Sequence, residues 1–192
     1  PDGEMPTMPE GATFGGNGGP GGGMGSEDVK LQYIDDDPDS YANIFDNAKT
    51  DISEADEQRL IASLKKLSAN EEIESVVDVE QVIRYFVVHN YVCNDDSYTG
   101  MMVHNYYLYE DDGVLSMIPW DYNLAFGGFS SGGGATSLVN HPIDDPLLSG
   151  QMEDRPMLSW IFAEDTYLER YHQLFDEFIT TYFESGAFEE MY

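Results

Sequence analysis

Three polar residues in the middle of the chain, Asp96, Asn105 and Asp121, have the side-chain types and the order that phosphoryl transfer requires. A carboxylate can orient an attacking hydroxyl and accept its proton, while carboxylate and amide oxygens can hold Mg²⁺ against the phosphates of a nucleotide. In protein kinases a catalytic Asp comes first along the chain, then a metal-binding Asn and, after a hairpin, a metal-binding Asp. The same order predicts Asp96 as the catalytic residue and Asn105 and Asp121 as residues that bind the metal and the nucleotide. The interval from Asp96 to Asn105 is longer than in ordinary kinases.

Each of these three residues also has an ordinary structural explanation. Asp96 is suited to capping its own loop, Asn105 to capping a strand and Asp121 to opening a turn. Together they favour a metal site, because neighbouring carboxylates without a cationic partner are costly and a divalent ion relieves that cost. No Lys or Arg lies between Arg84 and Arg155, so metal ions or cations from elsewhere must offset the charge of a bound nucleotide.

Two helices are expected to position the loop that carries Asp96. Ser53 begins the first, because its hydroxyl can cap the opening turn and Asp56 stands at the reciprocal position of a capping box. An apolar stripe follows, made by Leu60, Ile61, Leu64 and Leu67. The second helix begins near Asp78 and is apolar over much of its circumference, which indicates a central, buried helix. A further helix is expected over residues 166–183.

A β-hairpin is expected directly after this loop. Residues 105–110 and 114–120 read as strands, and the turn signal at 111–113 between them is typical of a hairpin. The second strand ends directly before Asp121. A separate short strand is expected at residues 31–34, where apolar residues alternate weakly.

The composition predicts one folded domain preceded by a flexible segment. Residues 1–26 hold 10 of the 19 glycines and show no hydrophobic periodicity, so they are interpreted as a disordered linker or a loop insertion. Residues 27–192 are interpreted as the folded domain, and the 41% of hydrophobic residues in the chain is enough for a core. Cys93 is the only cysteine, which excludes an intrachain disulfide. Neither a signal peptide nor an apolar run of transmembrane length is recognisable.

The charge balance is strongly acidic. Eight Lys and Arg stand against 37 Asp and Glu, which gives a formal net charge of −29. Such a surface repels nucleic acid and anionic membranes and attracts basic partners or divalent cations, so we expect no nucleic-acid partner. An acidic run at residues 35–39 lacks the glycine and the distal Glu of an EF-hand loop, so it is interpreted as a solvated turn rather than a calcium site.

Several sequence blocks carry a resemblance to a known family. They are YFVVHNY at 85–91, NDDSYTG at 94–100, HNYYLYE at 104–110 and IPWDYNLAFG at 118–127, with VNHPID at 139–144 and RPML at 155–158 as later pieces. The order and spacing of these blocks are specific. Over roughly residues 31–175 the chain resembles the CotH family of spore-coat and surface-protein kinases.

The resemblance implies an α+β fold like the C-terminal catalytic lobe of a protein kinase, mainly helical with a β-hairpin at the active site. It implies ATP-dependent phosphorylation of Ser or Thr in basic, Ser-rich proteins, with Mg²⁺ or Mn²⁺ as cofactor and a place in the spore coat or at the cell surface. Asp96 matches the catalytic Asp of the family and Asp121 its magnesium-binding Asp, with Asp95 as the alternative to Asp96. The role of Asn105 rests on the order of residues in kinases alone.

A kinase fold also has an N-terminal, mostly β lobe that supplies a phosphate-binding Lys. Lys30 and Lys49 precede the core, but no strand pattern resembling that lobe surrounds them. We therefore expect this chain to be the C-terminal catalytic portion of a longer protein, and to be weak or inactive by itself.

Two other functions remain open from the sequence. The acidic, aromatic-rich composition also suits a non-catalytic coat or surface module that binds basic partners. A metal-dependent hydrolase using His89, His104 and the same acids is the third reading, because histidine and carboxylate together bind zinc or iron. His89, however, lies within a largely apolar helix, where a buried core histidine is the more common arrangement.

Overall fold

The computed structural model describes residues 27–128 and 134–191. The expected linker, residues 1–26, and most of the Gly-rich loop that begins at 127 lie outside the described residues. In chain order the elements are η1 (Pro38–Tyr41), α1 (Ala42–Phe45), α2 (Glu54–Ser68), α3 (Ile73–Val76), α4 (Val79–Tyr91), β1 (Tyr106–Asp111), β2 (Val114–Pro119), α5 (Gly134–Leu138), η2 (Met152–Asp154), α6 (Pro156–Ala163), α7 (Asp165–Ile179), η3 (Thr180–Glu184) and α8 (Ala187–Met191). Within the described part the protein is therefore mostly helical with one two-stranded antiparallel sheet, which agrees with the expected α+β class.

Helix α2 begins where the capping pattern predicted. The backbone N–H of Ser53 donates to Asp56 Oδ2 at 2.8 Å, which satisfies an amide that the first turn of a helix leaves unpaired. The predicted apolar stripe is buried along one face of this helix, at Leu60, Ile61, Leu64 and Leu67. This face packs against α6.

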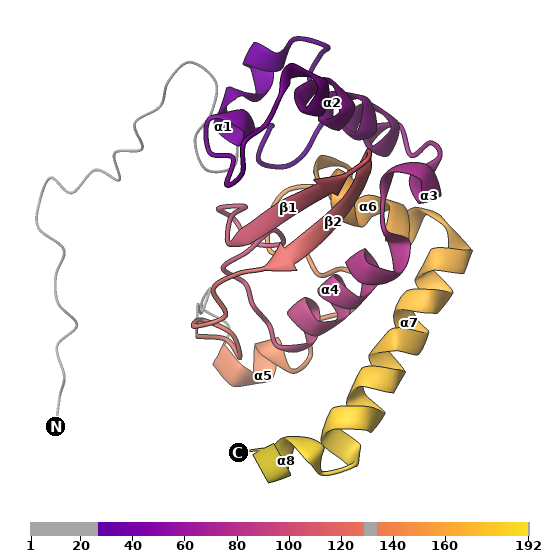
Figure 1. Ribbon diagram of the computed structural model, residues 1–192. Helices are drawn as coiled ribbons and strands as arrows, with labels where there is room; N and C mark the ends of the chain where they lie inside the picture. The colour runs from indigo at the N-terminus through magenta and orange to yellow at the C-terminus, as the bar shows by residue number, and fades with distance from the viewer. Residues whose placement is uncertain (1–26, 129–133, 192) are drawn as a thin grey trace, which may run out of the picture.

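Helix α4 is the central element, as predicted. Figure 1 shows it between the hairpin and the long C-terminal helix α7, and it contacts both β2 and α7. Asp78 caps its first turn by accepting a hydrogen bond from Gln81 N at 3.2 Å. The Gln81 side chain then donates to Met117 O at 2.5 Å and accepts from Met117 N at 3.1 Å. These two hydrogen bonds fix the position of the hairpin along α4, and therefore the positions of the residues at the ends of the hairpin.

The hairpin has the predicted location, to within one residue at each strand end. Its register pairs Tyr106 with Pro119 at the open end and Asp111 with Val114 at the turn. Both central turn residues have positive φ, 52° at Asp112 and 89° at Gly113, which is the geometry of a type I′ turn and explains the Asp-Gly signal. The open end of the hairpin therefore carries the residues directly before 106 and directly after 119.

The predicted strand at residues 31–34 is wrong. Leu31 has φ of 63° and closes a turn by donating from its amide to Asp28 O at 2.8 Å. The amides of Ile34 and Asp35, which a strand would pair with another strand, donate instead to the Tyr41 hydroxyl at 2.7 and 3.2 Å. The segment is held by a side chain rather than by a sheet.

The acidic run at 35–39 forms a capped, solvent-exposed turn. Asp37 Oδ1 accepts from Asp39 N at 3.1 Å at the start of η1, and Asp36 pairs with Lys65 at 3.0 Å. The last predicted helix, 166–183, is observed as α7 followed by the π-helical turn η3. None of the helices in the described ranges is both long and apolar enough to cross a membrane.

Candidate active site

The structure brings Asp96 and Asn105 into direct contact. Asn105 Nδ2 donates to the backbone oxygen of Asp96 at 2.9 Å and to its carboxylate Oδ2 at 3.1 Å. Asp96 is only 8% exposed, and its other oxygen, Oδ1, accepts no hydrogen bond from the described residues. His104 Nε2 lies 3.2 Å from that Oδ1. The amide of Asn105 therefore orients Asp96 through Oδ2, while Oδ1 is buried beside the His104 ring.

Asp121 lies at the same end of the hairpin. Because Tyr106 pairs with Pro119, the residue before β1 and the residues after β2 leave the sheet side by side. The Asp121 side chain is exposed, and its Oδ1 accepts from Asn123 N at 3.4 Å. No hydrogen bond joins Asp121 to Asp96 or Asn105 in the described structure, so the third predicted residue shares the hairpin end with the pair without bonding to it.

A buried histidine ties the segments of the two aspartates together. His89, on α4, has its Nε2 hydrogen-bonded to the Ser97 hydroxyl and its Nδ1 3.1 Å from the Tyr122 hydroxyl. Ser97 directly follows Asp96 and Tyr122 directly follows Asp121, so the imidazole joins both segments to the C-terminal end of α4. This His89 bridge connects the loop with the hairpin exit.

His89 is electrically neutral in this position. Its side chain is fully buried, and burial lowers its pKa from 6.5 to about 3. A neutral imidazole has one donor and one acceptor nitrogen, which suits a bridge between two hydroxyl groups. The prediction of a buried core histidine is therefore confirmed, and this histidine also forms the His89 bridge.

The backbone at the candidate site is held in an uncommon conformation. Asn105 and Asp121 have φ of 56° and 53°, in the left-handed region that Asn and Asp tolerate better than other non-glycine residues. Val103, between Asp96 and Asn105, also has positive φ, 50°, which is a true outlier for a β-branched residue. Backbone strain of this kind clusters at functional sites, where the surrounding structure imposes it.

A model of the family described as CotH kinase protein matches residues 23–192. The chain belongs to the CotH kinase protein family. No curated protein and no solved structure matches it. Membership confirms the predicted resemblance, and it implies a kinase-like fold, ATP and a protein substrate for this CotH chain.

The candidate residues fit a magnesium site in part. The Asp121 carboxylate and the Asn105 amide oxygen are hard oxygen donors of the kind that Mg²⁺ prefers. The Asn105 amide nitrogen already donates to Asp96, so its oxygen is the atom available to a metal. Among residues 27–128 and 134–191, no group of three or more His, Cys, Asp or Glu side chains is arranged to hold a metal ion. One carboxylate and one amide would suffice only if nucleotide phosphates and water completed the shell, as is usual for Mg²⁺.

Sequence reasoning missed the role of Arg155 in this CotH chain. Its guanidinium is 2% exposed and donates to Tyr98 O at 3.0 Å, and to Gly100 O and Ser149 O at 3.4 Å each. The side chain thus satisfies the backbone of the loop that carries Asp96, and it does not reach solvent to meet a phosphate. The sequence signal for this role was that Arg155 is the first Lys or Arg after Arg84.

Gly100 completes the support of this loop. A Cβ at this position would lie 2.0 Å from Asp95 O, closer than any real contact, so the loop closes only with glycine at this point. The turn is held by Gly100 N donating to Ser97 O at 3.1 Å.

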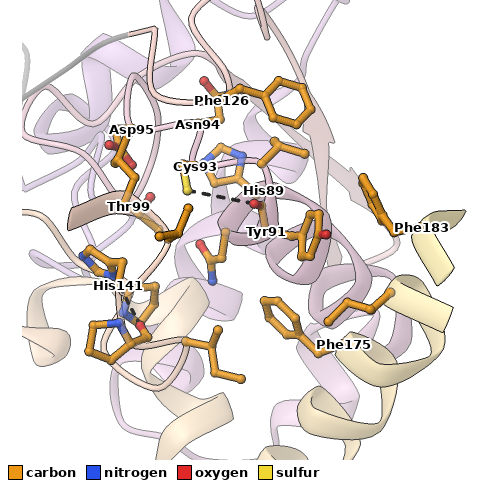
Figure 2. Close-up of a pocket in the computed structure, with 18 of the residues that line it drawn as sticks. His89, Tyr91, Cys93, Asn94, Asp95, Thr99, Phe126, His141, Phe175 and Phe183 are labelled. Atoms are coloured by element: carbon orange, nitrogen blue, oxygen red, sulfur yellow. Dashed lines mark hydrogen bonds between the residues drawn. The ribbon is translucent and has the colours of Figure 1, made fainter. Parts of the chain in front are cut away.

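Asp95 and Asp96 have different surroundings, although they are adjacent in the sequence. Asp95 lines a cavity of about 720 Å³ on the side of α4 and α7, whereas Asp96 contacts the hairpin through Asn105. Burial raises the pKa of Asp95, an effect that His141 opposes. Figure 2 shows Asp95, Thr99 and His141 along one side of this cavity. The geometry favours Asp96 over Asp95 as the acid next to the other candidate residues.

Proposed function

We propose that this chain carries the phosphotransfer centre of an ATP- and Mg²⁺-dependent protein Ser/Thr kinase, which acts on basic, Ser-rich coat or surface proteins. The observation that supports it most is the Asn105 amide bonded to the backbone and side chain of Asp96 at the open end of the hairpin. Asp121 leaves the hairpin at that same end, and the His89 bridge ties both aspartate segments to α4.

In this proposal each residue has a distinct task. The hydroxyl oxygen of the substrate bonds to the γ-phosphorus of ATP, the bond from that phosphorus to the bridging oxygen breaks, and ADP leaves. The Asp96 carboxylate orients the hydroxyl and accepts its proton, and the Asn105 amide holds that carboxylate in place through Oδ2. Asn105 Oδ1 and the Asp121 carboxylate would hold Mg²⁺. Bound Mg²⁺ would offset the phosphate charge, a need that the buried Arg155 does not meet.

The test of this proposal is a thermal-shift titration with ATP, with and without Mg²⁺, on the chain and on Asp121→Ala. Ligand at a hundred times its dissociation constant stabilises a fold by about 2.7 kcal/mol. We expect a magnesium-dependent rise in melting temperature that Asp121→Ala loses. Asp111→Ala, an exposed aspartate at the other end of the same hairpin, is the matched control and should keep the rise. A rise that survives Asp121→Ala, or no rise in the unsubstituted chain, would count against the nucleotide site.

The His89 bridge makes a second prediction. In His89→Leu, which keeps the apolar packing and loses both bridge bonds, kcat for phosphotransfer should fall by about tenfold or more, because the two aspartate segments lose their common anchor. His89→Gln can still bond one hydroxyl and should recover part of that loss.

The pH dependence separates the bridge from acid–base catalysis by His89. Because the pKa of His89 is about 3, the imidazole does not titrate in the neutral range, and the kcat profile of His89→Gln between about pH 5 and pH 9 should keep its shape. Loss of a rate-controlling pKa from that profile, or an unchanged kcat in His89→Leu, would contradict the bridge.

One observation favours a second function, a non-catalytic module that binds basic partners. The net charge is −29, and between residues 84 and 155 the sequence has no Lys or Arg to meet a phosphate. Such a module would bind a basic protein in a salt-sensitive way and show no response to ATP.

A further inference from the structure

One oxygen of the proposed general base, Asp96, is closed off in this structure. Oδ2 accepts a hydrogen bond from the Asn105 amide at 3.1 Å, whereas Oδ1 is buried without a hydrogen bond from the described residues, and His104 Nε2 lies 3.2 Å from it. A general base must come within about 2.6–3.2 Å of the group whose proton it takes, directly or through one water. Contact of a substrate hydroxyl with Oδ1 therefore requires a neighbouring side chain to move.

His104 is the neighbour that can move. Asn105 is held by two hydrogen bonds to Asp96, at 2.9 and 3.1 Å. The His104 ring, in contrast, has no polar contact in the described structure apart from that of its Nε2 with Asp96 Oδ1. Its side chain is 32% exposed, against 10% for that of Asp96, so the ring is the outer of the two groups and can turn towards solvent.

The closed position of the ring leaves two buried polar atoms unsatisfied. His104 Nδ1 and Asp96 Oδ1 are both buried, and neither has a hydrogen-bond partner among the described residues. Buried polar atoms are nearly always hydrogen-bonded, because an unpaired one loses its bonds to water without replacement. An outward turn of the ring would return both atoms to water. Solvation therefore opposes the closed position and makes a second, open arrangement accessible.

The backbone confines this movement to the side chain of His104. Val103 is 2% exposed and Asn105 is bonded to Asp96, so the residues on both sides of His104 are fixed. Val103 has φ of 50°, an uncommon conformation for a β-branched residue, which the surrounding structure must impose. The segment thus holds His104 beside the carboxylate on a fixed backbone.

We propose that the His104 side chain is a movable cover on Asp96. Without substrate the ring shields Oδ1 from water, and a substrate hydroxyl displaces the ring when it contacts the carboxylate. His104 is a positioning residue in this scheme, because it does not touch the reacting atoms. The displacement step rests on the proposed function, whereas the shielding is a property of the chain alone and is measured without ATP.

Carbodiimide coupling of glycinamide to carboxylates tests the shielding. Mass spectrometry reads the coupling rate at Asp96, with fragment ions that separate it from Asp95. A minor open state is populated at about 10% or less, so His104→Ala should raise the rate at Asp96 by about tenfold or more. Asp95, which lines the cavity beside α4 and α7, should couple at an unchanged rate.

Three further variants make this test specific. His104→Phe keeps a flat ring and should keep Asp96 shielded. His104→Asn removes the ring, should expose Asp96, and replaces His104→Ala if that variant does not fold. His172→Ala, the same change in a partly exposed histidine on α7, should leave the rate at Asp96 unchanged. An unchanged rate in the folded variant without a ring, or an equal increase in His104→Phe, would overturn the cover.

Peptide kinetics on a longer protein that includes the expected upstream lobe test the displacement. Apparent affinity is reduced by the fraction of the protein in its binding-competent state, so His104→Ala should lower KM for the peptide by about tenfold and leave KM for ATP unchanged. Loss of a merely structural residue would lower kcat instead. An unchanged or higher KM for the peptide would contradict the displacement step. Absence of phosphotransfer in the unsubstituted protein would refute the proposed function, and the coupling rates would still decide on the cover.

Discussion

Asp96→Asn is expected to lower kcat for phosphotransfer by about 10²- to 10⁴-fold, the range attributed to a positioned general base. The substitution keeps the shape of the side chain and removes its ability to accept the substrate proton. The Asn105 amide can still donate to the backbone oxygen of residue 96 and to the new amide oxygen, so the loop should keep its structure. KM for ATP should therefore change little, because the residues proposed to hold the metal, Asn105 and Asp121, remain in place.

The measurement, on a longer protein that includes the expected upstream lobe, is steady-state transfer of labelled phosphate from ATP to a basic, Ser-containing peptide. Asp112→Asn is the matched control, because it makes the same chemical change in an exposed turn whose positive φ Asn accommodates. If Asp95→Asn rather than Asp96→Asn removed the activity, the catalytic role would belong to Asp95. If both kept it, the site assignment would be wrong.

Arg155→Met should cause a large loss of folding stability. The guanidinium donates to the backbone oxygens of Tyr98, Gly100 and Ser149 in a buried setting. Removal leaves these acceptors without donors, at about 1–3 kcal/mol each where they stay buried. We expect a loss of about 3 kcal/mol or more, which lowers the melting temperature by roughly 6–12 °C in a chain of this length.

Urea unfolding of Arg155→Met checks this prediction, with Arg84→Met as the control. Arg84 is half-exposed and pairs with Glu80 on the surface of α4, so its loss should cost less than about 1 kcal/mol. Arg155→Lys should recover little, because a single ammonium group cannot reproduce the planar fork that reaches several carbonyl oxygens. A cost below about 1 kcal/mol for Arg155→Met would show that the loop does not depend on this residue.

The sequence by itself determined the elements whose signals are local. Ser53 and Asp56 start α2, Asp78 starts α4, and the turn ending at Gly113 makes the hairpin. Each of these features depends on groups within about four residues of one another, so the pattern and its cause lie in one short stretch. The order of Asp96, Asn105 and Asp121 and the family blocks were equally readable, because they are properties of the linear chain.

The tertiary structure decided where long-range partners lie. Residues 31–34 read as a strand, yet a strand requires a second strand to pair with. The amides of Tyr33 and Ile34 donate instead to the hydroxyls of Ser68 and Tyr41. The Tyr122 partner of His89 lies 33 residues away, and Arg155 reaches the backbone of Tyr98 across 57 residues. Spacing cannot reveal such contacts, because they depend on how α4, the hairpin and α6 pack.

The different surroundings of Asp95 and Asp96 are also a consequence of the tertiary structure. As neighbours in an irregular loop they were interchangeable by residue type, and only the fold determines which carboxylate contacts Asn105 and which lines the cavity. The turn closed by Gly100 and the buried guanidinium of Arg155 hold the loop in its conformation. Residue types and their order thus determined which groups are available for chemistry, while packing and buried hydrogen bonds determined which of them meet.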